Sequence, residues 1–240
     1  MEITENTPVG AIVAEDIRTA SVFTKVGIDF CCGGKKSLGE SCREAGTDLR
    51  RMVGELTSLM ETPVGYNQDF KAWDPGFLAD YIVQTHHRFV KQNLPELQFY
   101  TRKIADVHGE NHPELGEVAR LFGEVAAELT QHMAKEEEVL FPAGKRLLQA
   151  VSDAVREVMQ TGSASDREVV QSEIGRMKGE HDFAGGAMDH IHQITGGYRV
   201  PADGCNTYRV AFDRLRAFEE DLHVHVHLEN NILFPALLKA

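Results

Sequence analysis

Two stretches of the sequence repeat one arrangement of histidine, glutamate and proline. In each, a histidine is followed four residues later by a glutamate, and Phe-Pro begins nine residues after the histidine. The pairs are His132–Glu136 and His225–Glu229. Four residues turn an α-helix by about 400°, so the imidazole and the carboxylate of each pair share one helical face. Nitrogen and oxygen ligands placed in this way suit a first-row metal ion such as iron, manganese or zinc.

A single pair of this kind is ordinary helix chemistry and is typical of a salt bridge or a solvated face. Its repetition with the same Phe-Pro ending favours a metal site instead. Two helices that carry such pairs can present two carboxylates to two metal ions, as helical bundles with dinuclear sites do. The sequence therefore predicts a dinuclear centre between helices.

The composition limits the classes of partner. The 240 residues suffice for one sizeable domain with a small companion, and the net charge of −12 argues against nucleic acid or an anionic membrane. No apolar run is long enough to span a membrane, the N-terminus is acidic and polar unlike a secretory signal, and four cysteines do not make a disulfide scaffold. We therefore expect a cytoplasmic protein, and its 11 histidines are in keeping with metal binding.

Apolar periodicity and helix-ending residues divide the chain into three segments. Residues 1–60 predict a small domain of short helices, residues 61–73 a linker, and residues 74–240 four long helices. Short connections between long helices predict an up-down-up-down bundle. The expected fold class is thus all-α, a four-helix bundle with a small helical N-terminal domain, and Pro142 predicts a local bend late in the second long helix.

The first and third helices of this bundle should supply further ligands. The first offers His86 and His87, and the third offers His181. Spacings of 45, 49 and 44 residues separate His87, His132, His181 and His225. This regularity places one histidine per helix at a similar height in the bundle.

Five motifs together give the chain a family resemblance. They are Gly27–Gly34, Leu94–Leu97, His132–Pro142, Glu180–Asp182 and His225–Pro235. On these motifs nearly the whole chain resembles the Repair of Iron Centers family, di-iron proteins with a hemerythrin-like bundle behind a ScdA-type N-terminal domain.

The resemblance implies a set of ligands for two irons joined by oxo and carboxylate bridges. Histidines would be the terminal ligands and glutamates the bridges: His87, His132, His181, His225, Glu136 and Glu229. His86 stays an alternative to His87, although the distance back from Leu94-Pro95 favours His87. Oxygen-carrying hemerythrins have a second histidine one turn after the third-helix ligand, where this chain has Gly185. One ligand fewer predicts a more open centre, better suited to releasing iron or reacting with small molecules than to carrying oxygen.

The resemblance also implies a function. We expect a protein that repairs iron-sulfur clusters damaged by nitrosative or oxidative stress by supplying iron. Its partners would be damaged iron-sulfur proteins and the small molecules nitric oxide, oxygen and peroxide; a homodimer and enzyme status are left open. The alternatives are nitric oxide reduction at the di-iron site, and sensing of oxygen or nitric oxide, or iron storage, without catalysis.

Cys31 and Cys32 lie on a loop that two glycines follow. They are either an inert packed pair or a mobile dithiol that binds iron transiently or exchanges electrons. The glycines favour the functional interpretation, and Cys42 could join the pair. Cys205, in the last loop of the bundle, is expected to be incidental.

Four other polar residues are expected to lie off the ligand face. His223 and His227 point about 200° away from His225 around the helix, which predicts a solvated pair. Glu137 rotates off the ligand face and is also expected to be solvated. Glu180 is either a carboxylate that supports a ligand or a plain surface charge.

Overall fold

Every regular element that this computed structural model describes is a helix, and its described residues, 1–62, 69–156 and 164–240, contain no β-strand. The all-α fold class is therefore confirmed. Residues 63–68, at the centre of the expected linker, and residues 157–163 lie outside the described residues. The division into 1–60, 61–73 and 74–240 stays a prediction.

The chain forms two compact units. The N-terminal unit consists of Met1–Ala79 together with His223–Ala240, and the bundle unit consists of Asp80–Leu222. None of the helices in the described ranges is both long and apolar enough to cross a membrane.

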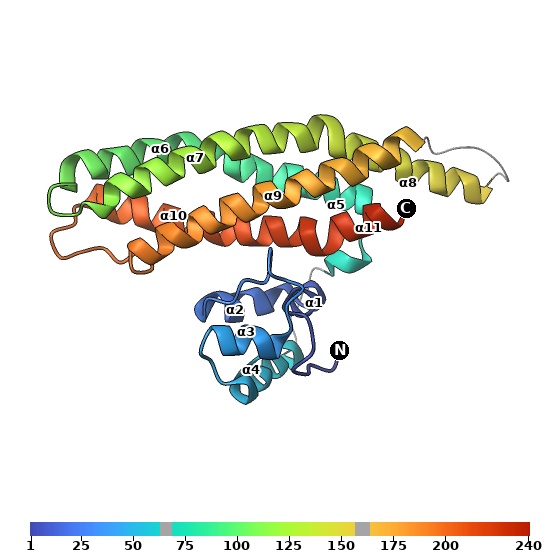
Figure 1. Cartoon of the computed structure of the whole chain (residues 1–240), viewed down its shortest axis with the longest axis horizontal. Coiled ribbons are helices and arrows are strands. Elements are labelled where there is room, and N and C mark those ends of the chain that lie inside the picture. The colour runs from blue at the N-terminus through green and yellow to red at the C-terminus, as the bar shows by residue number, and fades with distance from the viewer. Residues whose placement is uncertain (63–68, 157–163) are drawn as a thin grey trace. The chain divides into compact units, whose positions relative to one another are not determined.

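Short helices form most of the N-terminal unit (Figure 1). Polar caps and glycines set several of their ends. Ser37 caps α3 through its hydroxyl, and Asp48 caps α4 through its carboxylate. Gly27 and Gly46 follow α2 and α3 with φ of 70° and 64°, left-handed values that favour glycine. The bounds are α1 (Val9–Glu15), η1 (Ile17–Thr19), α2 (Ala20–Lys25), α3 (Leu38–Glu44), α4 (Leu49–Glu61) and η2 (Phe70–Ala72).

The last residues of the chain pack into this same unit. They are the end of α10 (Asn206–Leu228), η5 (Glu229–Leu233) and α11 (Phe234–Lys239). Asn231 makes the main polar contact, because its side-chain amide lies 3.1 Å from the Cys31 carbonyl oxygen and 3.3 Å from that of Phe30. Gly10 and Gly34 leave room for it, since a Cβ at either position would lie 2.7 Å from Asn231 Oδ1.

His227 is buried against the same loop, so the expected solvated pair is wrong for this residue. The Phe30 ring lies 5.7 Å from the His227 ring and 6.1 Å from the His223 ring, measured between centroids. Burial lowers the pKa of His227 to about 4, which keeps the imidazole neutral at physiological pH. The helical period correctly predicts that His227 points away from the face of His225, but it does not predict that the loop containing Phe30 covers His227.

The bundle unit consists of four long helical segments, whose helices α6, α7, α9 and α10 lie alongside one another (Figure 1). Its core contains aromatic contacts between helices, for example Phe218 of α10 with Phe89 of α6 and Phe122 of α7. The short connection from Gly109 to Pro113 makes α6 and α7 antiparallel neighbours. The bounds are α5 (Pro75–Ile82), η3 (Val83–His87), α6 (Arg88–His108), α7 (Glu114–Lys135), η4 (Glu136–Leu140), α8 (Phe141–Arg156) and α9 (Ala164–Ile194).

Three of the segments, η3, η4 and η5, are π-helical turns within longer helices. In η4 and η5 the N–H of Phe141 and of Phe234 donates to the carbonyl of the glutamate five residues earlier. The last residue of η4 and of η5 lies two residues before a proline, which has no N–H and whose ring would crowd an ordinary α-turn. The local bend expected at Pro142 thus takes the form of a π turn. Both copies of the repeated motif adopt this same backbone conformation.

Asn231→Ala should loosen the loop that carries Cys31. It removes the donor for two carbonyl groups, and such a loss costs about 1–3 kcal/mol of local stability. Hydrogen exchange of amides 30–34 should therefore become faster. Asn230→Ala is the control, because its amide is 3.5 Å from the Cys31 carbonyl oxygen, at the limit of a hydrogen bond. Equal protection in both variants would contradict the assignment.

Candidate metal centre

Within the bundle unit, three histidines converge on one buried carboxylate. Glu136 has no exposed surface, and His87, His132 and His181 are at most 1% exposed. The Nε2 atoms of His87 and His132 lie 3.3 and 3.2 Å from Glu136 Oε2. His181 Nε2 is 3.0 Å from His132 Nε2. The structure thus brings together the four side chains that the sequence nominates from the first three helices.

Local backbone structure positions these side chains. His87 is the last residue of η3, and Glu136 is the first residue of η4. A π turn displaces the following residues around the helix axis, and such turns occur frequently at functional sites. His132 precedes Glu136 by one regular turn of α7, which keeps their side chains on one face.

Two further carboxylates support the histidines from outside. His87 Nδ1 lies 2.7 Å from Glu137 Oε1, and His132 Nδ1 lies 2.9 Å from Glu180 Oε2. Each carboxylate also contacts a lysine: Glu137 accepts from Lys91 at 2.7 Å, and Glu180 accepts from Lys135 at 2.5 Å. The expectation that Glu137 is solvated is therefore wrong, and Glu180 takes the supporting position.

The charges of these carboxylates follow from their surroundings. Burial alone would raise the pKa of Glu137 and of Glu180. Hydrogen bonds from a lysine and a histidine outweigh burial and hold both pKa values below the ordinary range. Both groups are therefore anionic acceptors at neutral pH.

This arrangement fixes the tautomers of two histidines. An ionised carboxylate only accepts hydrogen bonds, so the Nδ1 atoms of His87 and His132 carry the hydrogen. In the neutral imidazole the Nε2 atom then has a lone pair, and both lone pairs face the Glu136 carboxylate. Imidazole nitrogens and a carboxylate at 3.2–3.3 Å attract one another when a cation, either a metal ion or an added proton, lies among them. The donor set therefore fits a metal ion held by imidazole nitrogen and carboxylate oxygen.

The N-terminal unit carries the second copy of the motif. His225 Nε2 lies 3.0 Å from Glu229 Oε1, and both side chains are at most 1% exposed. His225 ends one regular turn before η5 begins at Glu229, as His132 does before Glu136. This second pair thus has the same local geometry as the first.

His86 occupies a different environment from that of His87. Its Nδ1 atom lies 3.0 Å from Asp221 Oδ1, and its ring contacts Tyr81 at 5.8 Å between centroids. Of the two adjacent histidines, only His87 has its Nε2 directed at Glu136. The ligand role itself stays a prediction.

The Cys31 and Cys32 side chains are free thiols whose sulfur atoms lie 3.9 Å apart. Cys31 is buried and Cys32 is half-buried. The neighbouring Cys32 thiol, burial and Asp29 together raise the pKa of Cys31 well above its ordinary value. Cys42 is buried on α3.

Cys205, expected to be incidental, has a specific partner at one end of the bundle unit. Its sulfur lies 3.2 Å from His108 Nε2, and it is exposed. The hydrogen bond with His108 lowers the pKa of this thiol to about 7. No sequence pattern predicts this pair, because His108 at the end of α6 and Cys205 directly before α10 meet only in the folded chain.

The fold and the donor set define a helical cation-binding protein, and comparison with known proteins agrees. Residues 78–237 match the hemerythrin HHE cation binding domain, and residues 5–60 match ScdA_N, a domain of unknown function. The chain is 32% identical to the iron-sulfur cluster repair protein ScdA of Staphylococcus haemolyticus, over 97% of this chain and 98% of that protein. It is 31% identical to the iron-sulfur cluster repair protein YtfE of Yersinia pestis, over 98% and 97% of the two chains.

The chain therefore belongs to the hemerythrin-like family that includes ScdA and YtfE. The resemblance inferred from its motifs is confirmed.

Glu137→Gln and Glu180→Gln should each weaken metal binding in the bundle. A carboxylate behind a ligand histidine fixes its orientation and raises its basicity, and its loss typically costs about 10- to 100-fold in affinity. Competition with a chelator of known affinity measures the change. Glu138→Gln is the matched control, because Glu138 is exposed beside Glu137. Unchanged affinity in all three variants would rule out the supporting role.

His108→Phe should make Cys205 less reactive at neutral pH. With a pKa of about 7 roughly half of the thiol is ionised at pH 7, against about 3% at an ordinary pKa of 8.5. Lower basicity weakens each thiolate as a nucleophile, so the net loss of rate should be only about threefold. The midpoint of the pH–rate profile should rise by about 1.5 units. His112→Phe is the control, since His112 also contacts the Tyr208 ring but pairs with Asp203.

Proposed function

We propose that this protein holds two irons in the bundle and repairs damaged iron-sulfur clusters by supplying iron. The six side chains that would hold the irons are His87, His132, His181, His225, Glu136 and Glu229. His87, His132 and His181 are in the bundle unit with Glu136, and the matched cation-binding domain extends over both of its copies of the motif, from residue 78 to residue 237. Glu136 and Glu229 would bridge the irons, and an oxo bridge between them stays part of the proposal.

One observation carries the proposal. The Nε2 atoms of His87 and His132 lie 3.3 and 3.2 Å from an oxygen of the buried Glu136 carboxylate, which supports a metal cation among these donors. Nitrogen and oxygen donors without thiolate suit iron, manganese or zinc, and the names of ScdA and YtfE favour iron among these.

The charge of the donor set supports iron as cargo rather than as a permanent cofactor. In the ferrous state without an oxo bridge, neutral imidazoles contribute no charge, so the two carboxylates oppose only two of the four positive charges of two ferrous ions. The residual positive charge lies in a buried site, where it is costly. Binding is therefore weaker than in a site rich in thiolates or carboxylates, which favours release to an acceptor.

The chain's own residues would control access to this iron. Apolar and aromatic side chains exclude bulk water around the donors, as when the Phe141 ring stacks on His87 at 5.9 Å between centroids. The lysines that pair with Glu137 and Glu180 hold these carboxylates in place while they orient the imidazoles. Gly185, one turn after His181 on α9, offers no side-chain ligand.

The partners in this proposal are iron-sulfur proteins that have lost iron from their clusters. The location is cytoplasmic, and nitric oxide and peroxide are the agents of damage. A decisive assay incubates the iron-loaded protein with a cluster enzyme inactivated by nitric oxide and follows recovery of the enzyme's activity. Recovery should scale with the iron supplied, and recovery equal to that with free iron alone would refute the proposal.

Gly185 also favours a second candidate, reduction of nitric oxide at the iron centre. A position without a protein ligand on α9 lets a small molecule bind iron directly. Consumption of nitric oxide over many turnovers, with an electron donor present, would support this activity. Consumption limited to one or two equivalents per chain would exclude it and leave iron supply.

Glu136→Ala and Glu229→Ala should each lose roughly one iron or more per chain, because a bridging carboxylate contacts both ions. Iron analysis and the absorption spectrum measure the loss. Glu220→Ala on α10 is the control, since its side chain is exposed. Two irons and an unaltered spectrum in both variants would show that the bridging assignment is wrong.

A further inference from the structure

The Cys31–Cys32 loop contains a third possible metal ligand that the sequence motifs did not single out. One carboxylate oxygen of Asp29 and the sulfur atoms of Cys31 and Cys32 all lie within 4.8 Å of one another. Asp29 Oδ1 is 3.2 Å from Cys31 Sγ, and the two sulfur atoms are 3.9 Å apart. All three groups belong to one short loop of the N-terminal unit.

The distance between the sulfur atoms is compatible with chelation of one ion and too long for a disulfide. A disulfide bond needs about 2.05 Å between sulfur atoms. Two thiolates bound at about 2.3 Å to one tetrahedral ion are about 3.8 Å apart. The observed 3.9 Å matches the second value.

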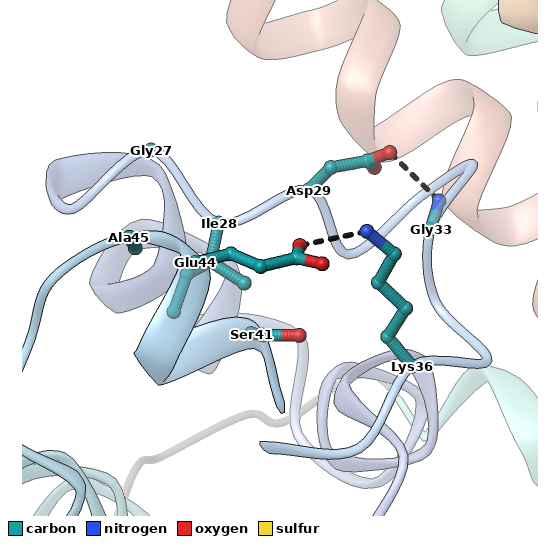
Figure 2. Close-up of a pocket in the computed structure, with 8 residues that line it drawn as sticks. All are labelled: Gly27, Ile28, Asp29, Gly33, Lys36, Ser41, Glu44 and Ala45. Atoms are coloured by element: carbon teal, nitrogen blue, oxygen red, sulfur yellow. Dashed lines mark hydrogen bonds and ion pairs between the residues drawn. The ribbon is translucent and has the colours of Figure 1, made fainter. Parts of the chain in front are cut away.

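The loop holds this geometry by itself. Asp29 Oδ1 accepts the N–H of Cys31 at 2.9 Å and that of Cys32 at 3.0 Å, and Oδ2 accepts the N–H of Gly33 at 2.7 Å. Figure 2 shows the carboxylate turned across the loop toward the Gly33 nitrogen. Asn231 fixes the other side of the loop through the Phe30 and Cys31 carbonyls. Ligands that are held before an ion arrives lose little entropy on binding.

The site is also accessible. Asp29 is exposed and Cys32 is half-buried, so an ion can reach the carboxylate and one thiol from solvent. A carboxylate has about four acceptor positions, and Oδ2 accepts a single N–H here, which leaves it room for an ion. Lys36, on the wall of the adjoining pocket, pairs with Glu44 at 2.7 Å, which reduces its repulsion of a cation (Figure 2).

We propose that Asp29, Cys31 and Cys32 bind one divalent first-row metal ion through two thiolates and a carboxylate, with a coordination position left open. Thiolate ligands select softer ions than the imidazole and carboxylate donors of the bundle do. An open position allows an incoming ligand to remove the ion. We call the site a station if it receives ferrous iron from the bundle and passes it to a damaged iron-sulfur protein; this role rests on the proposed function. Metal binding at the site can be tested independently of that function.

Cobalt(II) added to the full-length, iron-loaded protein tests the site, because thiolate-to-cobalt charge transfer absorbs in the near ultraviolet and bundle donors do not produce it. One equivalent should give the band with the intensity of two thiolates. Cys31→Ser and Cys32→Ser should each lose half of it or more, and Asp29→Asn should weaken binding about tenfold or more. Cys42→Ser and Cys205→Ser are matched controls and should leave the titration unaltered.

Several outcomes would overturn the proposal. No charge-transfer band in the unaltered protein would refute it, and loss of the band in Cys205→Ser would assign the metal to the His108–Cys205 pair. Thermal unfolding of the two serine variants, which keep nearly the size of cysteine, checks that the loop is folded. The iron content of the bundle, measured in the same samples, shows whether iron binding in the bundle is unaffected by the loop substitutions.

The station role has its own test. The double variant Cys31→Ser, Cys32→Ser, loaded with the same amount of iron as the unaltered protein, should repair a damaged cluster severalfold more slowly. Repair at an unaltered rate would refute the station while leaving the bundle as the source of iron. Absence of repair by the unaltered protein would refute the proposed function without affecting the cobalt result.

Discussion

The bundle depends on how a buried carboxylate is compensated. Glu136 has no exposed surface, and the atoms nearest its oxygen include two imidazole nitrogens whose tautomers leave them without hydrogens. Burial of an anion is expensive, and a cation held among these donors would stabilise it. The Glu137 and Glu180 carboxylates enforce those tautomers from outside, and Lys91 and Lys135 balance their charge. The lysines thus hold the Glu137 and Glu180 carboxylates, and these carboxylates orient the histidines that face Glu136.

The backbone is adapted to the same purpose. A π turn begins at Glu136 and another at Glu229, and each closes with a hydrogen bond from the phenylalanine that precedes a proline. Proline at this position removes a donor, and the widened turn accommodates its ring. The Phe-Pro ending of the repeated sequence is therefore a structural feature. It holds a wide turn where the carboxylate must point inward.

Much of this could be predicted from the sequence, and what could not has a common cause. The helices, their caps and the faces of His132, Glu136 and His225 follow from local periodicity. The partners of Glu137 and His227 do not, because each meets a segment that is far away in the sequence. Rotation off the ligand face correctly moved Glu137 away from the centre, but only the three-dimensional structure shows that its carboxylate then reaches His87 of η3. The helical period determines the direction in which a side chain points, whereas the neighbouring element determines which residue that side chain contacts.

The end of α10 and η5 carries proposed metal ligands on one face and contacts the cysteine loop with the other. His225 and Glu229 lie on one face of this segment, and His227 and Asn231 lie on the other. The first face offers metal ligands, while the second holds the Phe30 ring and the Cys31 carbonyl. A helical turn is rigid over four residues, so a shift of the cysteine loop acts on the backbone that also carries His225 and Glu229. Asn231 packs against Gly10 and Gly34 with no room for a Cβ between them, so such a shift acts directly on Asn231. The cysteine loop and the second ligand pair are therefore mechanically linked through a few residues, whichever metal each of them binds.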